Sequence, residues 1–171
     1  MFIMFKSFLC SVFIGLSFVV SSASANYQPR STLGASLHSL PSASITNVID
    51  RAHELLGTPY KWGGMSVEQG FDCSSLLVYL FKTQANIQIP RTTAAMHRST
   101  AATIQRNALK PGDAVFFKGN GRGQVSHVGL YIGEGKFIHS PRTGKNVRID
   151  SLSNSYWNKH YTTAKRFHAA G

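Results

Sequence analysis

One cysteine in the segment FDCSSLLVYL carries the first chemical signal of the sequence. Apolar residues at Leu76, Leu77 and Leu80 predict a helix that begins at Cys73, with Asp72 as its N-cap. The first turn of a helix presents unpaired backbone N–H groups and the positive end of the helix dipole, and both favour thiolate over thiol. The position therefore predicts a nucleophile with a pKa below that of an ordinary thiol. The alternative is a small buried side chain without chemistry.

A base for this thiol is expected in the segment SHVGLYIGEGKFIHS, which contains two histidines. Two strand-like runs flank the residues GEG, and a three-residue hairpin loop would pair Ile132 with Lys136. Counting back pairs Gly129 with His139. His127 then lies diagonally from His139 on one face, about 7–8 Å away, a span that aromatic rings can bridge. Gly129 leaves room for the two rings to meet.

Cys73, His127 and His139 would form a nucleophile, a base and an orienting group. Cys73 attacks a carbonyl carbon, His127 accepts the thiol proton and later protonates the leaving amine, and His139 fixes one tautomer of His127. The backbone N–H of Cys73 would help to stabilise the oxyanion. Two alternatives stay open. The histidines are polar residues on an exposed sheet face, or the three side chains bind zinc, although the close-spaced ligand pairs of structural zinc are missing.

The elements that position these residues follow from hydrophobic periodicity. It predicts helices over about 44–56 and 73–85, a shorter helix within 92–104, and a loop over 60–72. Short apolar runs predict strands at 114–117, 127–132, 136–140, 147–149 and 165–168. Helices followed by antiparallel strands predict an α+β fold, in which N-terminal helices pack on the sheet and the nucleophile lies at a helix N-terminus.

The N-terminal residues predict export. Residues 1–25 contain Lys6, an apolar run and the small residues Ala23-Ser24-Ala25, a pattern typical of a secretory signal peptide that is cleaved before Asn26. An uncleaved membrane anchor is the alternative. Cleavage would remove one of the two cysteines and leave Cys73 without a disulfide partner. We expect a linker or N-terminal arm over 26–43 and one domain over 44–171.

Composition limits the class of protein and of partner. The chain has 171 residues, 43% of them hydrophobic and 15% charged, as in a globular protein. Its formal net charge is +11, which falls to +10 without Lys6. Such a charge favours anionic partners. Because export argues against nucleic acid, we expect an envelope polymer with carboxylates or an anionic membrane surface.

Several ordered segments resemble one family. The segments LLGTPYKWGG, GFDCSSLLVYLF, IPRTT, LKPGDAVFF and SHVGLYIGEGKFIHSPRTG resemble the NlpC/P60 cysteine peptidases of bacterial cell walls. The resemblance covers about residues 45–168 and implies a papain-like α+β fold, with the cysteine at the head of a helix and the histidines on a facing sheet. One position departs from the family, which usually has Asp-Cys-Ser-Gly where this chain has Ser75.

The resemblance also assigns roles to residues. It implies that Cys73 is the nucleophile, His127 the base and His139 the third, polar residue. It implies that four further residues lie at or near the substrate, and these are Tyr60, Asp72, Ser126 and Arg91.

The implied activity is hydrolysis of peptidoglycan stem peptides, between D-glutamate and meso-diaminopimelate or at a related amide, without a metal or organic cofactor. We expect the protein in the periplasm, the cell wall or outside the cell, with no stable membrane insertion after signal cleavage and with a regulator of its activity. Two rival functions stay open: a non-catalytic peptidoglycan-binding protein on the same fold, and a papain-like amidase or acyltransferase with another substrate.

Overall fold

The computed structural model describes residues 43–119 and 123–168, which lie within the unit Leu37–Gly171. The predicted signal peptide and nearly all of the predicted arm over 26–43 lie outside the described residues. None of the helices in the described ranges has the length and hydrophobicity that a membrane span requires.

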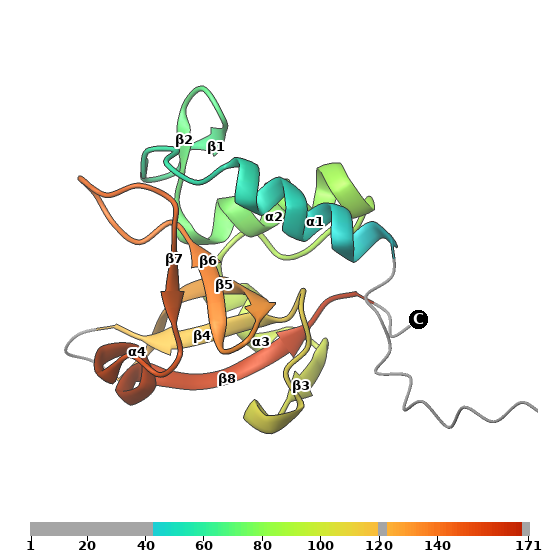
Figure 1. The fold of residues 1–171 in the computed structure, drawn as a ribbon, viewed down its shortest axis with the longest axis vertical. Helices are drawn as coiled ribbons and strands as arrows, with labels where there is room; N and C mark the ends of the chain where they lie inside the picture. The colour runs from blue at the N-terminus through green and yellow to red at the C-terminus, as the bar shows by residue number, and fades with distance from the viewer. Residues whose placement is uncertain (1–42, 120–122, 169–171) are drawn as a thin grey trace, which may run out of the picture. The chain divides into compact units, whose positions relative to one another are not determined.

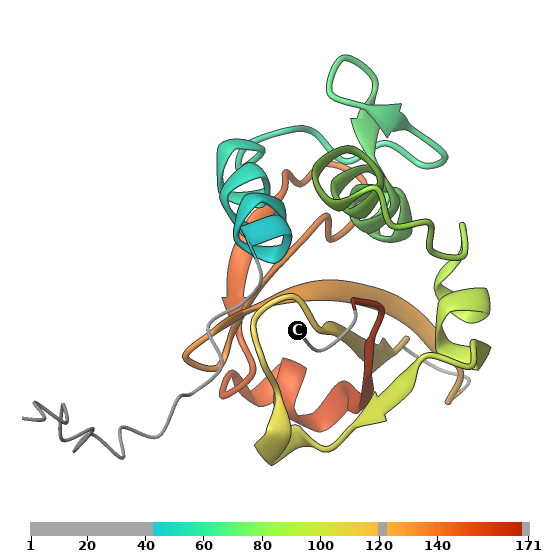
Figure 2. The ribbon, with the colours of Figure 1, turned by 90° about the vertical axis from the view of Figure 1, so that its right-hand side faces the viewer.

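Two helices, α1 (Ala43–Glu54) and α2 (Cys73–Ala85), pack side by side on one face of a sheet (Figures 1 and 2). Both helices bury the apolar positions that recur at helical spacing in the sequence. For α1 and α2 these are Ile45, Val48, Ala52, Leu76, Leu77, Leu80 and Phe81. Among the strands, α2 contacts mainly the central β5, so this packing fixes the N-terminus of α2 relative to the sheet.

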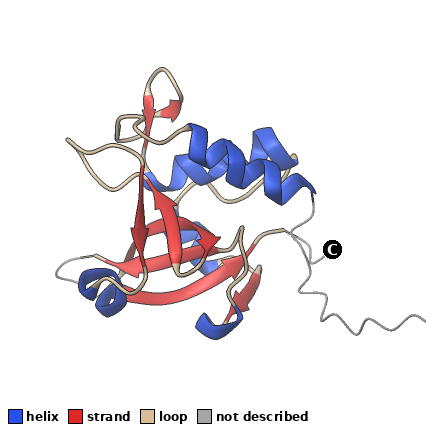
Figure 3. Cartoon of the chain, viewed as in Figure 1, coloured by secondary structure: helices blue, strands red, loops and turns tan. Residues whose placement is uncertain are grey.

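Six antiparallel strands form that sheet, in the order β3-β8-β4-β5-β6-β7 (Figure 3). They are β3 (Ala102–Ile104), β4 (Ala114–Lys118), β5 (Val125–Gly133), β6 (Lys136–His139), β7 (Arg148–Ser151) and β8 (Tyr161–Arg166). Strands β4 to β7 follow one another in the sheet as in the sequence, while β8 returns to lie between β3 and β4. The helices and this sheet confirm the predicted α+β fold.

The two faces of the sheet contact different groups of side chains. On β4, Ala114 and Phe116 pack in the core that includes α1 and α2, whereas Val115 and Phe117 pack in a second cluster on the opposite face. His127 pairs with Phe117 in the β4–β5 register. Because directly paired residues point to the same face, His127 lies on the side of the second cluster.

The β5–β6 hairpin differs from the prediction at its turn. Tyr131 pairs with Phe137 as expected, but Lys136 pairs with Gly133 rather than with Ile132. The predicted three-residue loop is therefore wrong. The turn has two central residues with positive φ, Glu134 (51°) and Gly135 (69°), which is the geometry of a type I′ hairpin, and it leaves one extra residue as a bulge on β5. The pairing nearer the histidines is not shifted.

Short elements account for the other differences. The segment 60–72, expected to be a loop, contains the two-residue strands β1 (Met65–Ser66) and β2 (Gly70–Phe71). Helix α3 (Thr93–Arg98) is confirmed, but the end of its predicted segment is strand β3.

Two short helices were not expected, the 3-10 helix η1 (Arg106–Ala108) and α4 (Ser155–His160). The last strand, β8, begins before its predicted range. Elements this short do not complete enough turns or alternations to show a period in the sequence.

Candidate active site

The N-terminus of α2 is closed by a capping box between Asp72 and Ser75. Asp72 Oδ1 accepts a hydrogen bond from the Ser75 N–H (2.7 Å), and Ser75 Oγ accepts one from the Asp72 N–H (2.8 Å). This reciprocal pair satisfies two backbone donors and fixes Cys73 as the first helical residue. The residue at which this sequence departs from the family pattern, Ser75, is thus half of the cap.

Asp72 is also bound by Arg91, which comes from the connector before α3. Arg91 Nη2 lies 3.0 Å from Asp72 Oδ2, and Arg91 Nη1 donates to Ser74 Oγ (3.0 Å). Burial acts to raise the pKa of Asp72, but hydrogen bonds from Arg91, Ser75 and Ser74 outweigh burial and lower the pKa. In this structure the two predicted substrate residues Asp72 and Arg91 bind each other at the head of α2.

The Cys73 thiol is partly buried, and its sulfur lies 3.5 Å from Thr93 Oγ1. Burial raises the pKa of Cys73. The Thr93 hydroxyl opposes this shift, the negative charge of Asp72 adds to it, and the backbone N–H groups of Val128 and Ser74 oppose it. Because the net shift is upward, the expectation of a thiolate at rest is wrong: the resting group is a neutral thiol.

Tyr60 lies within electrostatic range of the nucleophile. Its backbone forms a bridge with Phe71, shortly before the cysteine, and its N–H donates to Lys145 O (2.9 Å). Burial raises the pKa of the Tyr60 phenol, and negative charge on Cys73 and Asp72 raises it further. The phenol is therefore a neutral hydrogen-bond donor close to the sulfur.

The two histidine rings meet on the face of the second cluster. His127 Nε2 lies 2.7 Å from His139 Nδ1, so the contact that the hairpin register predicted is present. A Cβ atom on Gly129 would lie 2.6 Å from the Phe137 ring and 3.3 Å from His139 Cβ. A side chain at this position would collide with the Phe137 ring beside the two histidines, so the packing here requires glycine.

A fourth residue, Asp150 on β7, extends this pair. His139 Nε2 lies 2.9 Å from Asp150 Oδ2. Burial acts to raise the pKa of Asp150, but hydrogen bonds from His139 and Arg148 outweigh it and lower the pKa to about 2. Asp150 is thus a carboxylate, which can only accept, so His139 must carry its proton on Nε2.

The charge on Asp150 fixes the protons along the whole chain of groups. Burial lowers the pKa of His139, so this ring is neutral and its proton lies on Nε2. Its Nδ1 therefore accepts a hydrogen bond from the His127 Nε2–H. In the neutral His127 ring the unprotonated nitrogen is then Nδ1. Burial, the neighbouring His139 and Arg148 lower the pKa of His127 to about 3, although Asp150 opposes this shift, so the ring is neutral at physiological pH. His127 Nδ1 is therefore available as a base.

Trp157 on α4 holds these groups in place. Its indole stacks on the His127 ring, with centroids 5.4 Å apart, and meets the His139 ring edge-on at 4.9 Å. Its Nε1–H donates to Asp150 Oδ2 (2.9 Å). Each ring of the pair thus has one orientation set by packing and by a hydrogen bond.

Sequence reasoning missed Asp150 and Trp157. Asp150 lies one residue beyond the predicted strand 147–149, and Trp157 lies on a helix that was not expected. One signal was available for Asp150, because the chain has only seven acidic residues and this one follows a strand next to the histidine hairpin.

The Cys73 sulfur lies against strand β5, at the residue after His127. The backbone N–H of Val128 acts on the Cys73 sulfur, and Val128 directly follows His127. Strand β6 ends at His139, so the part of β5 that extends past this residue has no β6 partner. The N-terminus of α2 lies along this part of β5, and here Ser140 Oγ donates to Phe71 O (2.7 Å). The helix end and the histidine face therefore meet along one strand.

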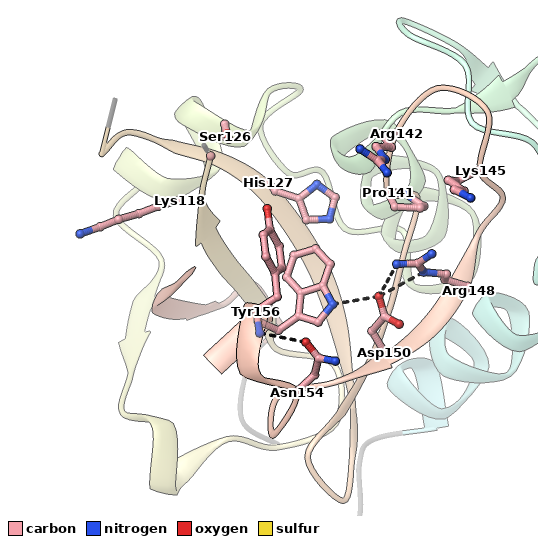
Figure 4. Close-up of a pocket in the computed structure, with 12 residues that line it drawn as sticks. Lys118, Ser126, His127, Pro141, Arg142, Lys145, Arg148, Asp150, Asn154 and Tyr156 are labelled. Carbon is pink, nitrogen blue, oxygen red and sulfur yellow. Dashed lines mark hydrogen bonds and ion pairs between the residues drawn. The ribbon is translucent and has the colours of Figure 1, made fainter. Parts of the chain in front are cut away.

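Next to His127 lies a cavity of about 480 Å³ (Figure 4). Of the seven predicted site residues, His127 and Ser126 line it, whereas Tyr60, Asp72, Cys73 and Arg91 gather at the end of α2 and His139 is fully buried. Within residues 43–119 and 123–168, no group of three or more His, Cys, Asp or Glu side chains is placed to hold a metal ion. His127, His139 and Asp150 form a linear relay of hydrogen bonds, not a set of ligands that point toward one metal ion.

Comparison with known proteins identifies the family of the chain. The profile of the NlpC/P60 family matches residues 57–166, a range that contains the cysteine, both histidines and Asp150. The chain belongs to the NlpC/P60 family. Its domain is similar to murein DD-endopeptidase MepH of Escherichia coli, with 50% identity over 119 residues, and to the probable endopeptidase YafL of the same organism, with 42% over 125 residues.

These matches cover 69% and 72% of this chain but 44% of MepH and 50% of YafL, so the chain spans about half the length of these relatives. Among solved structures, an NlpC/P60 family protein of Bacillus cereus superposes with a TM-score of 0.67 at 35% identity, covering 72% of this chain and 40% of that one. The NlpC/p60 domain of peptidoglycan hydrolase SagA superposes with a TM-score of 0.61 at 28% identity, over 71% of this chain and 97% of that domain. The NlpC/P60 fold thus accounts for the described residues.

Proposed function

We propose that this NlpC/P60 protein is a cysteine endopeptidase that hydrolyses an amide bond in peptidoglycan peptides. The observation that supports this proposal best is the relay Asp150–His139–His127, which leaves His127 Nδ1 unprotonated on the strand that borders the Cys73 sulfur. A wall-binding protein without catalysis would have no use for a nucleophile, a base and two groups that fix the tautomer of that base.

In the first half of the reaction, Cys73 Sγ attacks the carbonyl carbon of the scissile amide while its proton passes to His127 Nδ1. Because thiol and imidazole are both neutral at rest, attack and proton transfer are coupled. The carbonyl oxygen becomes an oxyanion, which the backbone N–H groups at the head of α2 stabilise. The C–N bond then breaks, and imidazolium His127 gives its proton to the departing amine.

In the second half, water attacks the thioester carbon and loses a proton to His127 Nδ1. The C–S bond breaks and the proton returns to the Cys73 sulfur, which releases a carboxylic acid and restores the resting thiol. Asp150 and His139 keep the Nε2 proton of His127 in place through both steps. They act as positioning residues and exchange no proton with the substrate.

Two bonds are candidates for cleavage. The resemblance of the motifs points to the bond between D-glutamate and the diamino acid of the stem peptide. The relative with 50% identity is named a DD-endopeptidase, which favours a bond between two D-centres as the second candidate. Both bonds place the amino group of a diamino acid on the leaving side.

The proposal includes an exported protein, with residues 1–25 removed, that acts in the periplasm or at the cell wall. The formal net charge, +11 for the full chain and +10 without Lys6, suits an anionic wall polymer. A papain-like amidase or acyltransferase with another substrate is the rival that the same site chemistry would allow. Acyl transfer differs only in the acceptor of the acyl group, an amine or alcohol in place of water.

The test is to incubate the purified protein with cross-linked and monomeric muropeptides and to identify the products by mass. We expect products that gain one water per cleaved bond, and none with Cys73→Ala. Monomer fragments whose masses place the cut after D-glutamate identify the D-glutamyl bond. Conversion of dimers that are cross-linked between two D-centres to intact monomers identifies the DD bond. Binding of muropeptides without cleavage, equal in both proteins, would contradict the proposal and favour a wall-binding function.

A further inference from the structure

The cavity beside His127 has a strongly basic lining that the proposed reaction does not use. Four cationic side chains line it, Lys118, Arg142, Lys145 and Arg148, and Asp150 is the acidic residue among its lining residues. Figure 4 shows Arg142, Lys145 and Arg148 together on one side of the cavity, with Lys118 and Ser126 on the other. A concave site lined by one sign of charge concentrates ligands of the opposite sign.

A tight turn brings two of these cations together. The Lys145 N–H donates to Arg142 O (3.0 Å), and Gly144 has a φ of +76°, so residues 142–145 form a hydrogen-bonded turn. The first and last Cα atoms of such a turn lie within about 7 Å of each other. The backbone turn therefore holds Arg142 and Lys145 as neighbours, although their like charges repel.

The same loop is fixed to the segment that carries Tyr60. The Tyr60 N–H donates to Lys145 O (2.9 Å), and the Val147 N–H donates to Thr58 O (2.8 Å). Pro59 and Asn146 form a bridge between the two segments. The position of the cations relative to the nucleophile is thus set by backbone hydrogen bonds.

The charge in this cavity is only partly compensated. Arg148 donates to Asp150 through Nε (3.1 Å) and Nη2 (2.8 Å), and that carboxylate already serves His139. Among the described residues, Arg142 and Lys145 form no side-chain ion pair or hydrogen bond. Two cations are therefore available to an anionic ligand about 480 Å³ or less in volume, which is the size range of small-ligand sites.

We propose that this cavity binds a free carboxylate of the leaving fragment, with Arg142 and Lys145 as its ion-pair partners. The reaction sets which half of the substrate arrives there. His127 must come within hydrogen-bond reach of the departing amine to protonate it, so the leaving fragment lies on the His127 side of the scissile bond. The cavity adjoins His127, whereas Cys73, which holds the acyl half, does not line it.

The inference rests on the proposed function and deepens it. It selects leaving residues that carry both the scissile amine and an unamidated carboxylate, a description that fits a diamino dicarboxylic acid at either candidate bond. The rings of Tyr156 and Trp157 also line the cavity and offer apolar contact to the carbon chain of such a residue. Arg142 and Lys145 are thus specificity-determining residues, not groups that touch the reacting atoms.

The kinetic test compares two muropeptides that differ only in amidation of the leaving diamino acid. For the unmodified protein we expect kcat/KM to be about ten- to one-hundredfold higher for the free carboxylate, the range of a charge-assisted hydrogen bond. The double variant Arg142→Gln/Lys145→Gln should lose this preference through KM while kcat is retained. Equal effects on both substrates, or no effect on either, would overturn the inference.

A matched control separates the site from the overall charge. Lys82→Gln/Arg98→Gln removes the same two charges from α2 and α3, outside the cavity, and should lower kcat/KM for both substrates by one small common factor. A loss of substrate preference in this control would mean that the net charge of the protein, and not the cavity, selects the carboxylate.

A binding measurement keeps the inference independent of catalysis. The chain has two tryptophans, and the ¹⁵N indole signal of Trp157 can be assigned with Trp62→Phe. Titration with meso-diaminopimelate should shift the Trp157 signal saturably, whereas its diamide and inorganic phosphate should not, and Arg142→Gln/Lys145→Gln should abolish the shift. If muropeptides are not cleaved but this shift is present, the proposed function fails and the carboxylate site stands. No shift, or an equal shift with phosphate, refutes the carboxylate site.

Discussion

The helix end, formed by Asp72, Cys73, Ser75 and Arg91, and the histidine network, formed by His127, His139, Asp150 and Trp157, meet along β5 but are built differently. At the helix end the ionised groups bind the backbone and one another, and the reactive thiol is neutral. In the histidine network a single carboxylate sets the protons of two neutral rings, one after the other.

This difference divides the work of the site. The helix end fixes where the sulfur lies, through a cap closed within four consecutive residues. The histidine network fixes which nitrogen carries a proton, through contacts between β5, β6, β7 and α4. Charge at the helix end opposes ionisation of the thiol, so the reactivity of Cys73 must come from the base across the strand rather than from its own pKa.

The largest expected effect tests whether the two regions act as one catalytic unit. Cys73→Ala and His127→Ala should each lower kcat by on the order of 10⁴-fold or more, and the double variant should lose no more than the worse single variant. Rates on muropeptides, with circular dichroism to confirm folding, measure this. His53→Gln, an exposed histidine on α1, is the matched control and should leave kcat unchanged. Additive losses would mean that thiol and imidazole act separately.

A smaller effect is expected when the relay is cut at its far end. Asp150→Asn removes the charge that fixes His139, and we expect about a 100-fold loss of kcat, less than in a triad whose carboxylate contacts the base directly, because His139 lies between. The downfield ¹H resonance of the shared His127 Nε2 proton should disappear as well. Trp157→Phe keeps the His139–Asp150 hydrogen bond and should retain that resonance. A retained resonance and an unchanged rate in Asp150→Asn would contradict a positioning role.

The two regions also differ in what the sequence could predict. The helix end was predictable because its signals are local: a capping residue, a cysteine and an apolar period all lie within ten residues. The contact between His127 and His139 was predictable because a hairpin has a register that can be counted. Asp150 and Trp157 join the network from a neighbouring strand and a six-residue helix, whose positions depend on how the chain returns after β6. No periodic pattern in a single sequence predicts where the chain lies after β6.

The thiolate was the main error of sequence reasoning, and its cause is physical. A helix N-terminus favours negative charge, but burial of the sulfur and the adjacent Asp72 carboxylate oppose it. Asp72 is visible in the sequence, whereas the larger cost, burial of the sulfur, is not visible before packing is known. The effect of the helix dipole on Cys73 could be predicted from the sequence, whereas the cost of burying its sulfur could not.

The alkylation rate of Cys73 measures this balance. Because burial and Asp72 raise the thiol pKa, the thiolate is a minor species at neutral pH, and the rate with iodoacetamide should rise about tenfold per pH unit between about pH 6 and about pH 8. Mass spectrometry of the peptide that contains Cys73 separates it from Cys10. His127→Gln should follow the same profile, and Asp72→Asn should react faster at each pH. A rate independent of pH in this range would demonstrate a thiolate–imidazolium pair at rest.

The smallest effects concern the cap and should change stability while leaving the histidine network intact. Asp72→Ala removes the N-cap and the Arg91 ion pair and should lower the free energy of unfolding by about 1–2 kcal/mol. Ser75→Ala leaves the buried Asp72 N–H without its acceptor and should cost about 1 kcal/mol. Urea denaturation measures both, with Gln84→Ala on the same helix as the control.

Ser75→Gly, which restores the usual family residue, should be no more stable than Ser75→Ala, because glycine lacks the hydroxyl and adds backbone entropy to the unfolded state. If Ser75→Gly were instead as stable as the unmodified protein, the cap would not depend on this hydroxyl, and the position of the sulfur would be set by packing of α2 on β5.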